Sequence, residues 1–265
     1  AVAYLEGGAT YFVHDHVTAE KKFTFLHVDY KYAGYTRELD RDCYLDFDRI
    51  FTVSGEVKVV FNDVYPECRN KTLVFHNLID REEICRKAEL PGGFSDAYSG
   101  KRILTVGRLT AQKAYELAID AMKLLKDQGV KVRWYVLGEG ELRNKLQQKI
   151  DSLGLKEDFL LLGAVENPYP YYKQCDLYVH ATRFEGKSIA IQEAQVLGCT
   201  ILVSDSSGNR EQVENGTDGV LCQLSSGEIS RNIAELLRDE EKCRQYGKRA
   251  VARISSEQGD ILKLF

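Results

Sequence analysis

Short apolar runs alternate with segments of helical spacing along most of the chain. From residue 101 onward the runs contain β-favouring residues, and the segments between them repeat apolar residues every three or four positions. The predicted strands are 102–106, 132–137, 158–162, 176–180, 200–203 and 219–222. The predicted helices are 114–128, 140–153, 187–198, 228–238 and 240–253. Strict alternation predicts an α/β fold, a complete Rossmann-like domain with a six-stranded parallel sheet.

The first part of the chain shows the same alternation in a shorter form. Strands are predicted at 2–5, 23–27, 49–53 and 71–75, with a helix from Ala9 and another that Ser54 caps. These four strands begin abruptly at the start of the sequence and predict the second half of another Rossmann-like domain. We therefore expect the chain to be truncated at its N-terminus. The loop residues 91–95 predict a linker and a hinge. We therefore expect a partial domain at 1–95 and a complete one at 96–265.

Composition excludes several classes of protein. Net charge is −5 over residues 1–99 and +1 over 100–265, and no basic block points to nucleic acid. The seven cysteines form no CxxC pair, which favours reduced thiols in a cytoplasmic protein. Neither a signal peptide nor an apolar run of about 18 residues is present in this sequence.

The stretch from Asp176 to Asp205 reads as strand, loop, helix and strand. Two carboxylates bracket the helix start, Glu185 in the loop and Glu193 in the helix. Lys187, Ser188 and Ile189 open this helix, so their backbone N–H groups and the positive end of the helix dipole favour an anion. The alternative is two surface glutamates on a solvated helix.

This E-x7-E stretch, EGKSIAIQE, resembles the motif of retaining glycosyltransferases of the GT-B fold, in particular glycosyltransferase family 4, also called group 1. The resemblance implies that Glu193 binds the ribose hydroxyls of a nucleotide donor and that Glu185, a catalytic residue, contacts the donor sugar. It also implies that the N–H groups of residues 187–189 bind the donor diphosphate.

Two further cations follow the first strand of the second domain. Arg108 and Lys113 lie where doubly wound sheets bind ligands, and their charges suit a diphosphate. They resemble the G-R-x4-K element of the family, although Ala114 stands where the family commonly has glycine. The alternative is a pair of solvated surface cations.

Other positions are assigned by the same resemblance. Ala164 and Val165, after the third strand, would meet the nucleotide base. His27 is similar to a catalytic histidine near the donor sugar, although a lone histidine is as often structural. His180 has either a diphosphate or a structural role. Tyr169, Tyr171 and Tyr172 are expected to pack a short helix rather than stack on a base or sugar.

A G-x-G pair at Gly138 and Gly140 suggests a dinucleotide fingerprint, but Arg143 replaces its third glycine and argues against a dehydrogenase. The family has a similar run at this place. We expect its glycines to allow the backbone to approach the ligand closely.

The resemblance implies a bacterial hexosyltransferase of surface polysaccharide synthesis, since EGKSIA is similar to the capsular variant. The donor would be a UDP-linked hexose and the acceptor a saccharide or a lipid-linked saccharide. Arginine and lysine would replace a metal ion, so no metal and no cofactor are expected.

Localisation would be cytoplasmic, at the inner membrane face, with peripheral attachment through the missing N-terminal part. A fragment of this kind is expected to bind donor without necessarily transferring sugar. The alternatives are a non-catalytic nucleotide-sugar-binding module, a phosphorylase and a sugar-nucleotide epimerase.

Overall fold

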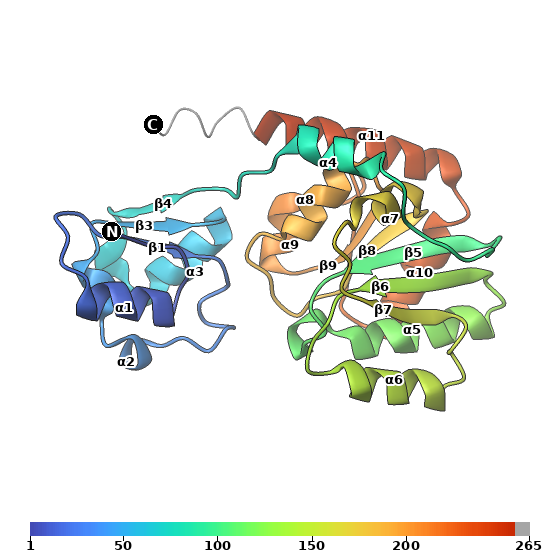
Figure 1. Cartoon of the computed structure of the whole chain (residues 1–265), viewed down its shortest axis with the longest axis horizontal. Coiled ribbons are helices and arrows are strands. Elements are labelled where there is room, and N and C mark those ends of the chain that lie inside the picture. Colours follow the sequence, from blue (N-terminus) through green and yellow to red (C-terminus); the bar gives the residue numbers. More distant parts are fainter. Residues whose placement is uncertain (258–265) are drawn as a thin grey trace. The chain divides into compact units, whose positions relative to one another are not determined.

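The computed structural model describes residues 1–257 and divides them into two compact units (Figure 1). Unit 1 comprises residues 1–78 together with the short segments 184–188 and 207–211. Unit 2 comprises residues 79–183, 189–206 and the described residues from 212 onward. Each unit is built on its own parallel sheet.

Unit 1 contains a four-stranded parallel sheet in the order β1-β2-β3-β4. Its strands are β1 (Val2–Ala3), β2 (Phe23–Leu26), β3 (Arg49–Thr52) and β4 (Thr72–Val74). Its helices are α1 (Gly8–His16), α2 (Arg37–Asp40) and α3 (Gly55–Val64). The predicted cap of α3 is confirmed, because the Ser54 side chain accepts a hydrogen bond from the Val57 backbone N–H at 3.2 Å.

A buried carboxylate organises the aromatic core of unit 1. Asp40 is fully buried and accepts hydrogen bonds from the hydroxyls of Tyr11 and Tyr30. Burial raises the pKa of Asp40, while the two hydroxyl donors act in the opposite direction. Tyr30 packs edge-on against Phe61 and Tyr65, so this polar contact lies within an aromatic cluster.

Unit 2 contains the predicted six-stranded parallel sheet. Its strands are β5 (Lys101–Val106), β6 (Val132–Leu137), β7 (Phe159–Gly163), β8 (Leu177–His180), β9 (Ile201–Ser204) and β10 (Val220–Cys222). Their order is β10-β9-β8-β5-β6-β7, which is the doubly wound order with its switch point between β5 and β8. Predicted and observed strand ends differ by at most one residue, since each strand is a nearly continuous apolar run, as a sheet covered on both faces requires.

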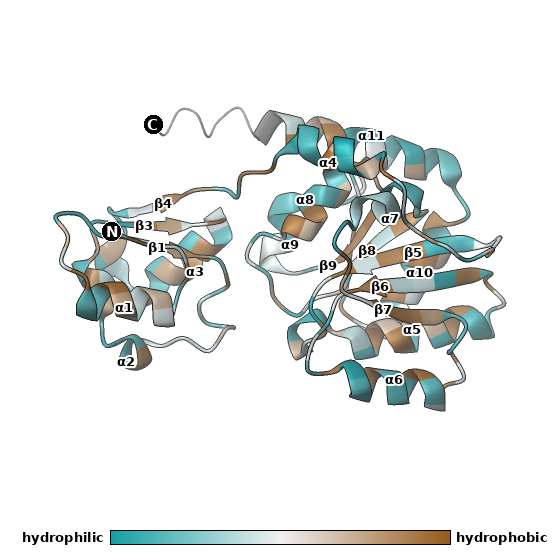
Figure 2. Ribbon diagram, in the orientation of Figure 1, coloured by the Kyte–Doolittle hydropathy of each residue, from teal (hydrophilic) through white to brown (hydrophobic). Residues whose placement is uncertain are grey.

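Helices cover both faces of this sheet, and Figure 2 shows its strands as largely apolar. One core joins the sheet to α5 (Tyr115–Asp127), α6 (Arg143–Ser152) and α10 (Ser226–Leu236). A second core joins it to α7 (Tyr169–Gln174), α8 (Ile189–Val196) and α11 (Glu240–Glu257). The short helix α9 is Ser207–Gln212. Helices α6 and α8 begin two or three residues later than their sequence pattern suggested.

The segment before β5 belongs to unit 2. Helix α4 (Arg81–Ala88) packs against α7 and α8, and Ile84 shares a small buried cluster with Val196. Beyond it, Asp96 accepts hydrogen bonds from Arg102, Arg133 and the Tyr135 hydroxyl. The structure thus groups residues 79–95 with unit 2. The contacts of α4 and of Asp96 lie on either side of the expected linker 91–95 and join both of its ends to this unit. The domain boundary at 95/96 stays a sequence-based prediction.

Helices long and apolar enough to cross a membrane are absent from residues 1–257.

Candidate functional site

The loops that follow β5 and β8 meet at the switch point of the six-stranded sheet. The Arg183 backbone N–H donates to the Gln112 carbonyl at 2.8 Å, and the Thr182 hydroxyl donates to the same oxygen at 3.1 Å. These two bonds join segments that lie about seventy positions apart in the chain. Parallel sheets place ligands at such a crevice, beyond the carboxyl ends of their strands.

A pocket of about 360 Å³ lies at the carboxyl ends of β5, β6 and β7. Arg108, Gly138, Ala164 and Val165 are among the residues that line it. Three of the positions predicted to bind donor, Arg108, Ala164 and Val165, therefore share one cavity, although fifty-odd residues separate the arginine from the others. A cation at one side of an open, mostly apolar pocket suits a ligand with a flat ring and an anionic group.

Lys113 lies next to this region and has a histidine partner. Its Nζ is 3.2 Å from His180 Nε2, and His180 Nδ1 is 3.1 Å from the Tyr178 hydroxyl. An ammonium group only donates, so Nε2 is the acceptor in this contact. His180 is buried at the end of β8. His180 thus contacts the Lys113 side chain, and the choice between its diphosphate and structural roles stays open.

The turn after Lys113 forms without the glycine that is common in the family. Ala114 takes a left-handed conformation, with φ 45° and ψ 34°, and its side chain is fully buried at the start of α5. An alanine pays about 1–2 kcal/mol for this conformation. The replacement therefore strains the turn but leaves the Lys113 backbone in the predicted loop.

The glycines of the G-x-G run allow two neighbouring loops to pack closely. A Cβ on Gly138, whose φ is 148°, would collide with the Gly107 carbonyl, and one on Gly140 would collide with the Leu109 backbone. The backbone at Gly138 and Gly140 thus lies close to the neighbouring loop after β5, which carries Arg108. Gly138 also lines the pocket described above, so close approach of these glycines to a ligand stays a prediction.

Glu193 is held by two tyrosines of α7. Its Oε1 accepts from the Tyr169 hydroxyl and its Oε2 from the Tyr172 hydroxyl, both at 3.1 Å, and the Tyr172 hydroxyl shares its single hydrogen with the Ala190 carbonyl at 3.2 Å. Burial raises the pKa of Glu193, and the two hydroxyl donors partly offset this rise. Each carboxylate oxygen has two acceptor directions, so both retain capacity for a further donor. The tyrosines do pack a short helix, as predicted, but sequence reasoning missed that two of them orient Glu193.

The segment that leads into α8 includes residues from both units. Lys187 and Ser188 are buried and belong to unit 1, whereas Ile189 is 52% exposed and belongs to unit 2. Lys187 Nζ lies 3.3 Å from His76 Nδ1, and the Asn77 amide donates to the Lys187 carbonyl at 3.4 Å. The pairing of Lys187 with His76 was not predicted, because more than one hundred residues separate them.

The two predicted catalytic residues both belong to unit 1. His27 follows β2, its Nε2 donates to the Tyr4 carbonyl at 2.9 Å, and its backbone N–H donates to Glu6 at 2.8 Å. Glu185 is partly buried in the adjoining loop. A Cβ on Gly186 would collide with the His27 carbonyl, so only glycine permits this loop to lie against the end of β2.

The predicted site residues are thus divided between the units. Unit 2 carries Arg108, Lys113, Ala164, Val165, Ile189 and Glu193, and unit 1 carries His27, Glu185, Lys187 and Ser188. Their individual roles stay predictions. Among residues 1–257, no group of three or more histidine, cysteine, aspartate or glutamate side chains is arranged to hold a metal ion.

Comparison with known sequences identifies related proteins. A family model described as "Glycosyl transferases group 1" matches residues 96–253. The chain is 32% identical, over 70% of its length and 50% of the relative's, to N-acetylgalactosamine-N,N'-diacetylbacillosaminyl-diphospho-undecaprenol 4-alpha-N-acetylgalactosaminyltransferase of Campylobacter jejuni. It is 33% identical, over 45% of its length and 32% of the relative's, to UDP-Gal:alpha-D-GlcNAc-diphosphoundecaprenol alpha-1,3-galactosyltransferase of Escherichia coli. The chain therefore spans about half or less of the curated relatives it matches.

Solved structures share the fold. The crystal structure of Anabaena Alr3699/HepE in complex with UDP and glucose aligns with a TM-score of 0.78 at 19% identity, covering 92% of this chain and 72% of that one. This likeness confirms the predicted GT-B fold class.

Proposed function

The chain belongs to the glycosyl transferases of group 1, and from that premise we propose that it binds a UDP-linked hexose and serves its transfer to a saccharide or lipid-linked acceptor. Membership confirms the predicted family and class of enzyme. The donor nucleotide, the acceptor and the stereochemical course belong to the proposal.

The pocket beyond β5, β6 and β7 is the single observation that supports the proposal most. It brings Arg108, Ala164 and Val165 together in one cavity of about 360 Å³. In the proposed complex the uracil ring lies against Ala164 and Val165, and Arg108 binds the diphosphate. The planar fork of arginine offers paired N–H donors to phosphate oxygens.

Glu193 is proposed to bind the ribose. The Tyr169 and Tyr172 hydroxyls fix its carboxylate, so the lone pairs that they leave can accept from the 2′- and 3′-hydroxyls. A carboxylate whose orientation is fixed before binding loses little rotamer freedom when the ribose arrives.

Stabilisation of the departing diphosphate is the proposed source of catalysis. Negative charge grows on this group as the bond to the sugar breaks, and preorganised cations and N–H donors lower the barrier. Arg108, Lys113 and the N–H groups of residues 187–189 would supply them, which makes a metal ion unnecessary in the proposal. In this proposal the contact with His180 would position Lys113 near this charge.

The sugar and acceptor are assigned to unit 1 residues. Glu185 would bind hydroxyls of the hexose, and His27 would lie near the reacting carbon. We propose transfer with retention, in which the acceptor attacks from the face that the diphosphate leaves and a phosphate oxygen takes the acceptor proton. Both curated relatives described above carry names with an undecaprenol diphosphate acceptor, which supports a lipid-linked saccharide and a location at the inner membrane face.

Calorimetric titration of the chain with UDP, GDP, ADP and CDP, without added metal, tests the proposal. We expect UDP to bind and the other three to bind at least about tenfold more weakly, because base and diphosphate contacts act together. Equal affinity for all four nucleotides would remove the base assignment. Lack of binding to every one of them would refute the donor site in this chain.

A further inference from the structure

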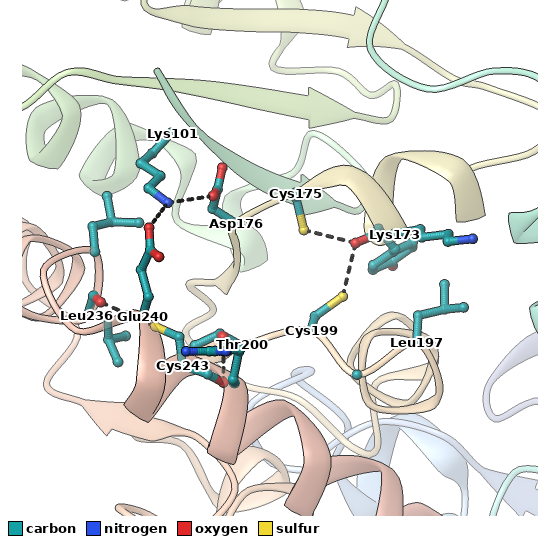
Figure 3. A pocket seen from close by; sticks show the side chains of 14 residues that line it. Lys101, Lys173, Cys175, Asp176, Leu197, Cys199, Thr200, Leu236, Glu240 and Cys243 are labelled. Atoms are coloured by element: carbon teal, nitrogen blue, oxygen red, sulfur yellow. Dashed lines mark hydrogen bonds and ion pairs between the residues drawn. The ribbon is translucent and has the colours of Figure 1, made fainter. Parts of the chain in front are cut away.

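A second pocket, of about 310 Å³, lies at the opposite end of the six-stranded sheet, where β8 and β9 begin. Three of the seven cysteines line it, namely Cys175, Cys199 and Cys243. Lys101 forms ion pairs with Asp176 and Glu240 beside it, at 3.1 and 2.7 Å (Figure 3). The proposed donor site makes no use of these groups.

Two of the thiols converge on one oxygen. Cys175 Sγ donates to the Tyr172 carbonyl at 3.2 Å, and Cys199 Sγ donates to the same oxygen at 3.3 Å. Figure 3 shows the two sulfurs directed toward that atom from two different segments. Cys243 instead donates to the Leu236 carbonyl at 3.2 Å, so it takes no part in this arrangement.

The strand register brings the two cysteine backbones close. Tyr178 lies opposite Ile201 in the parallel pair β8–β9. Continued two residues toward the strand starts, this register sets Asp176 beside Cys199, with Cys175 one step away. Regular strand alternation would turn the Cys175 and Cys199 side chains to opposite faces, but both residues precede the strands, and their sulfurs contact the same oxygen. Strands about 4.8 Å apart with a rise of about 3.3 Å give a Cα separation of roughly 6 Å. A disulfide spans Cα separations of about 4.4–6.8 Å.

Tyr172 connects this pair to the proposed donor site. Its carbonyl lies in the last turn of α7, where helical carbonyls lack an intrahelical partner, and the two thiols supply the donors. Its hydroxyl donates to Glu193. Tyr172 thus contacts the two thiols through its backbone carbonyl and the Glu193 carboxylate through its ring hydroxyl.

We propose that Cys175 and Cys199 form a reversible disulfide, and that this modification releases the Tyr172 carbonyl and loosens α7 around Glu193. The oxidant is a low-molecular-mass disulfide. The thiolate of one cysteine attacks it and releases one small thiol; the second cysteine then attacks the mixed disulfide and releases another. Two protein thiols are oxidised, one small disulfide is reduced to two thiols, and the protein loses two hydrogen atoms.

Reactivity should depend strongly on pH. Contact with the Cys199 thiol, followed by burial, raises the pKa of Cys175 well above its usual value. The thiolate is the attacking species, so the rate should rise about tenfold per pH unit below this pKa. The pair is therefore a slow-reacting one, distinct from the exposed Cys85 in α4.

Mass spectrometry of the whole chain treated with bis(2-hydroxyethyl) disulfide at pH 8 tests the modification. We expect a pair of peptides crosslinked through Cys175 and Cys199, whose mass is that of the two thiol peptides together less two hydrogen atoms. Dithiothreitol should reverse the crosslink. Cys243→Ser, which keeps the pair but changes the same pocket, should still form the link. A crosslink to Cys243 in place of this pair, or modification of Cys85 with no Cys175–Cys199 link, would overturn the proposal.

Amide hydrogen exchange tests the consequence separately. Loss of the donors to a buried carbonyl should speed exchange in α7 about tenfold or more in the oxidised protein. Cys175→Ser and Cys199→Ser, treated with the same reagent, serve as controls and should show no oxidation-dependent change. Unchanged exchange in α7 despite a complete crosslink would overturn the link to Glu193. Neither readout uses a nucleotide, so failure here is distinguishable from failure of the proposed function.

Discussion

The Glu193→Gln variant distinguishes a role of Glu193 in UDP binding from a role in the stability of the folded protein. The carboxylate accepts two tyrosine hydroxyls at 3.1 Å, and burial raises its pKa. Glutamine preserves the shape and one acceptor but removes the charge. A hydrogen bond to a charged acceptor contributes about 1.5–3 kcal/mol and a neutral one about 0.5–1.5 kcal/mol. The variant should therefore lose roughly 1.5 kcal/mol of UDP affinity, about tenfold.

Folding stability should respond in the opposite direction. Because the pKa of Glu193 is raised in the folded state, the folded protein binds more protons than the unfolded one in the window between the usual and the raised pKa. Wild-type stability therefore falls as pH rises through that window, and the cost of the buried charge persists above it. Glu193→Gln removes this cost, so its free energy of unfolding at pH 8 should equal or exceed that of the wild type.

Calorimetry with UDP and denaturant unfolding provide the two readouts. Glu235→Gln is a matched control, since Glu235 is an exposed glutamate on α10 whose contact is a surface ion pair with Arg231. The control should leave affinity and stability unchanged. A Glu193→Gln variant that unfolds more easily but binds UDP as the wild type does would refute the reasoning, because Glu193 would then be structural.

Three further predictions concern neighbouring contacts. His180→Phe removes the acceptor that holds Lys113, and UDP affinity should fall about threefold to tenfold while uridine affinity is unchanged, as measured by calorimetry. UDP affinity should weaken as pH falls through the raised pKa of Glu193, since ribose hydroxyls donate to the carboxylate form; Glu193→Gln should lack this pH dependence. Gly186→Ala should destabilise the protein by about 1–3 kcal/mol in denaturant unfolding, because its Cβ collides with the His27 carbonyl, whereas Gly227→Ala, with open space at its Cβ, should not.

Periodicity alone predicted the second sheet well. Its strands are continuous apolar runs, because both faces are covered, and turn residues separate them from helices with clear spacing. The four-residue helix α2 and the six-residue helix α9 were not predicted, since each is too short for its pattern to repeat. Helix α4 lies within the expected first domain but packs against α7 and α8, a tertiary contact that no local pattern encodes.

The sequence predicted which residues form the candidate site, but not which side chains contact and orient them. Motif spacing selected Arg108, Lys113 and Glu193, whereas the groups that orient them, His180 for Lys113 and Tyr169 and Tyr172 for Glu193, depend on which strands become neighbours. Gly138 shows the same limit. The sequence suggested close backbone approach at this glycine, but the atom that an added Cβ would meet is the Gly107 carbonyl oxygen on an adjacent loop.

A comparison of UDP with uridine tests the central claim most directly. The claim is that the pocket beyond β5, β6 and β7 binds a donor nucleotide through separate base and diphosphate contacts. Calorimetry on the wild type and on Arg108→Ala should show a loss of about 1.5–3 kcal/mol for UDP, equivalent to at least tenfold, and little change for uridine. Equal losses for both ligands, or no loss for UDP, would contradict the claim.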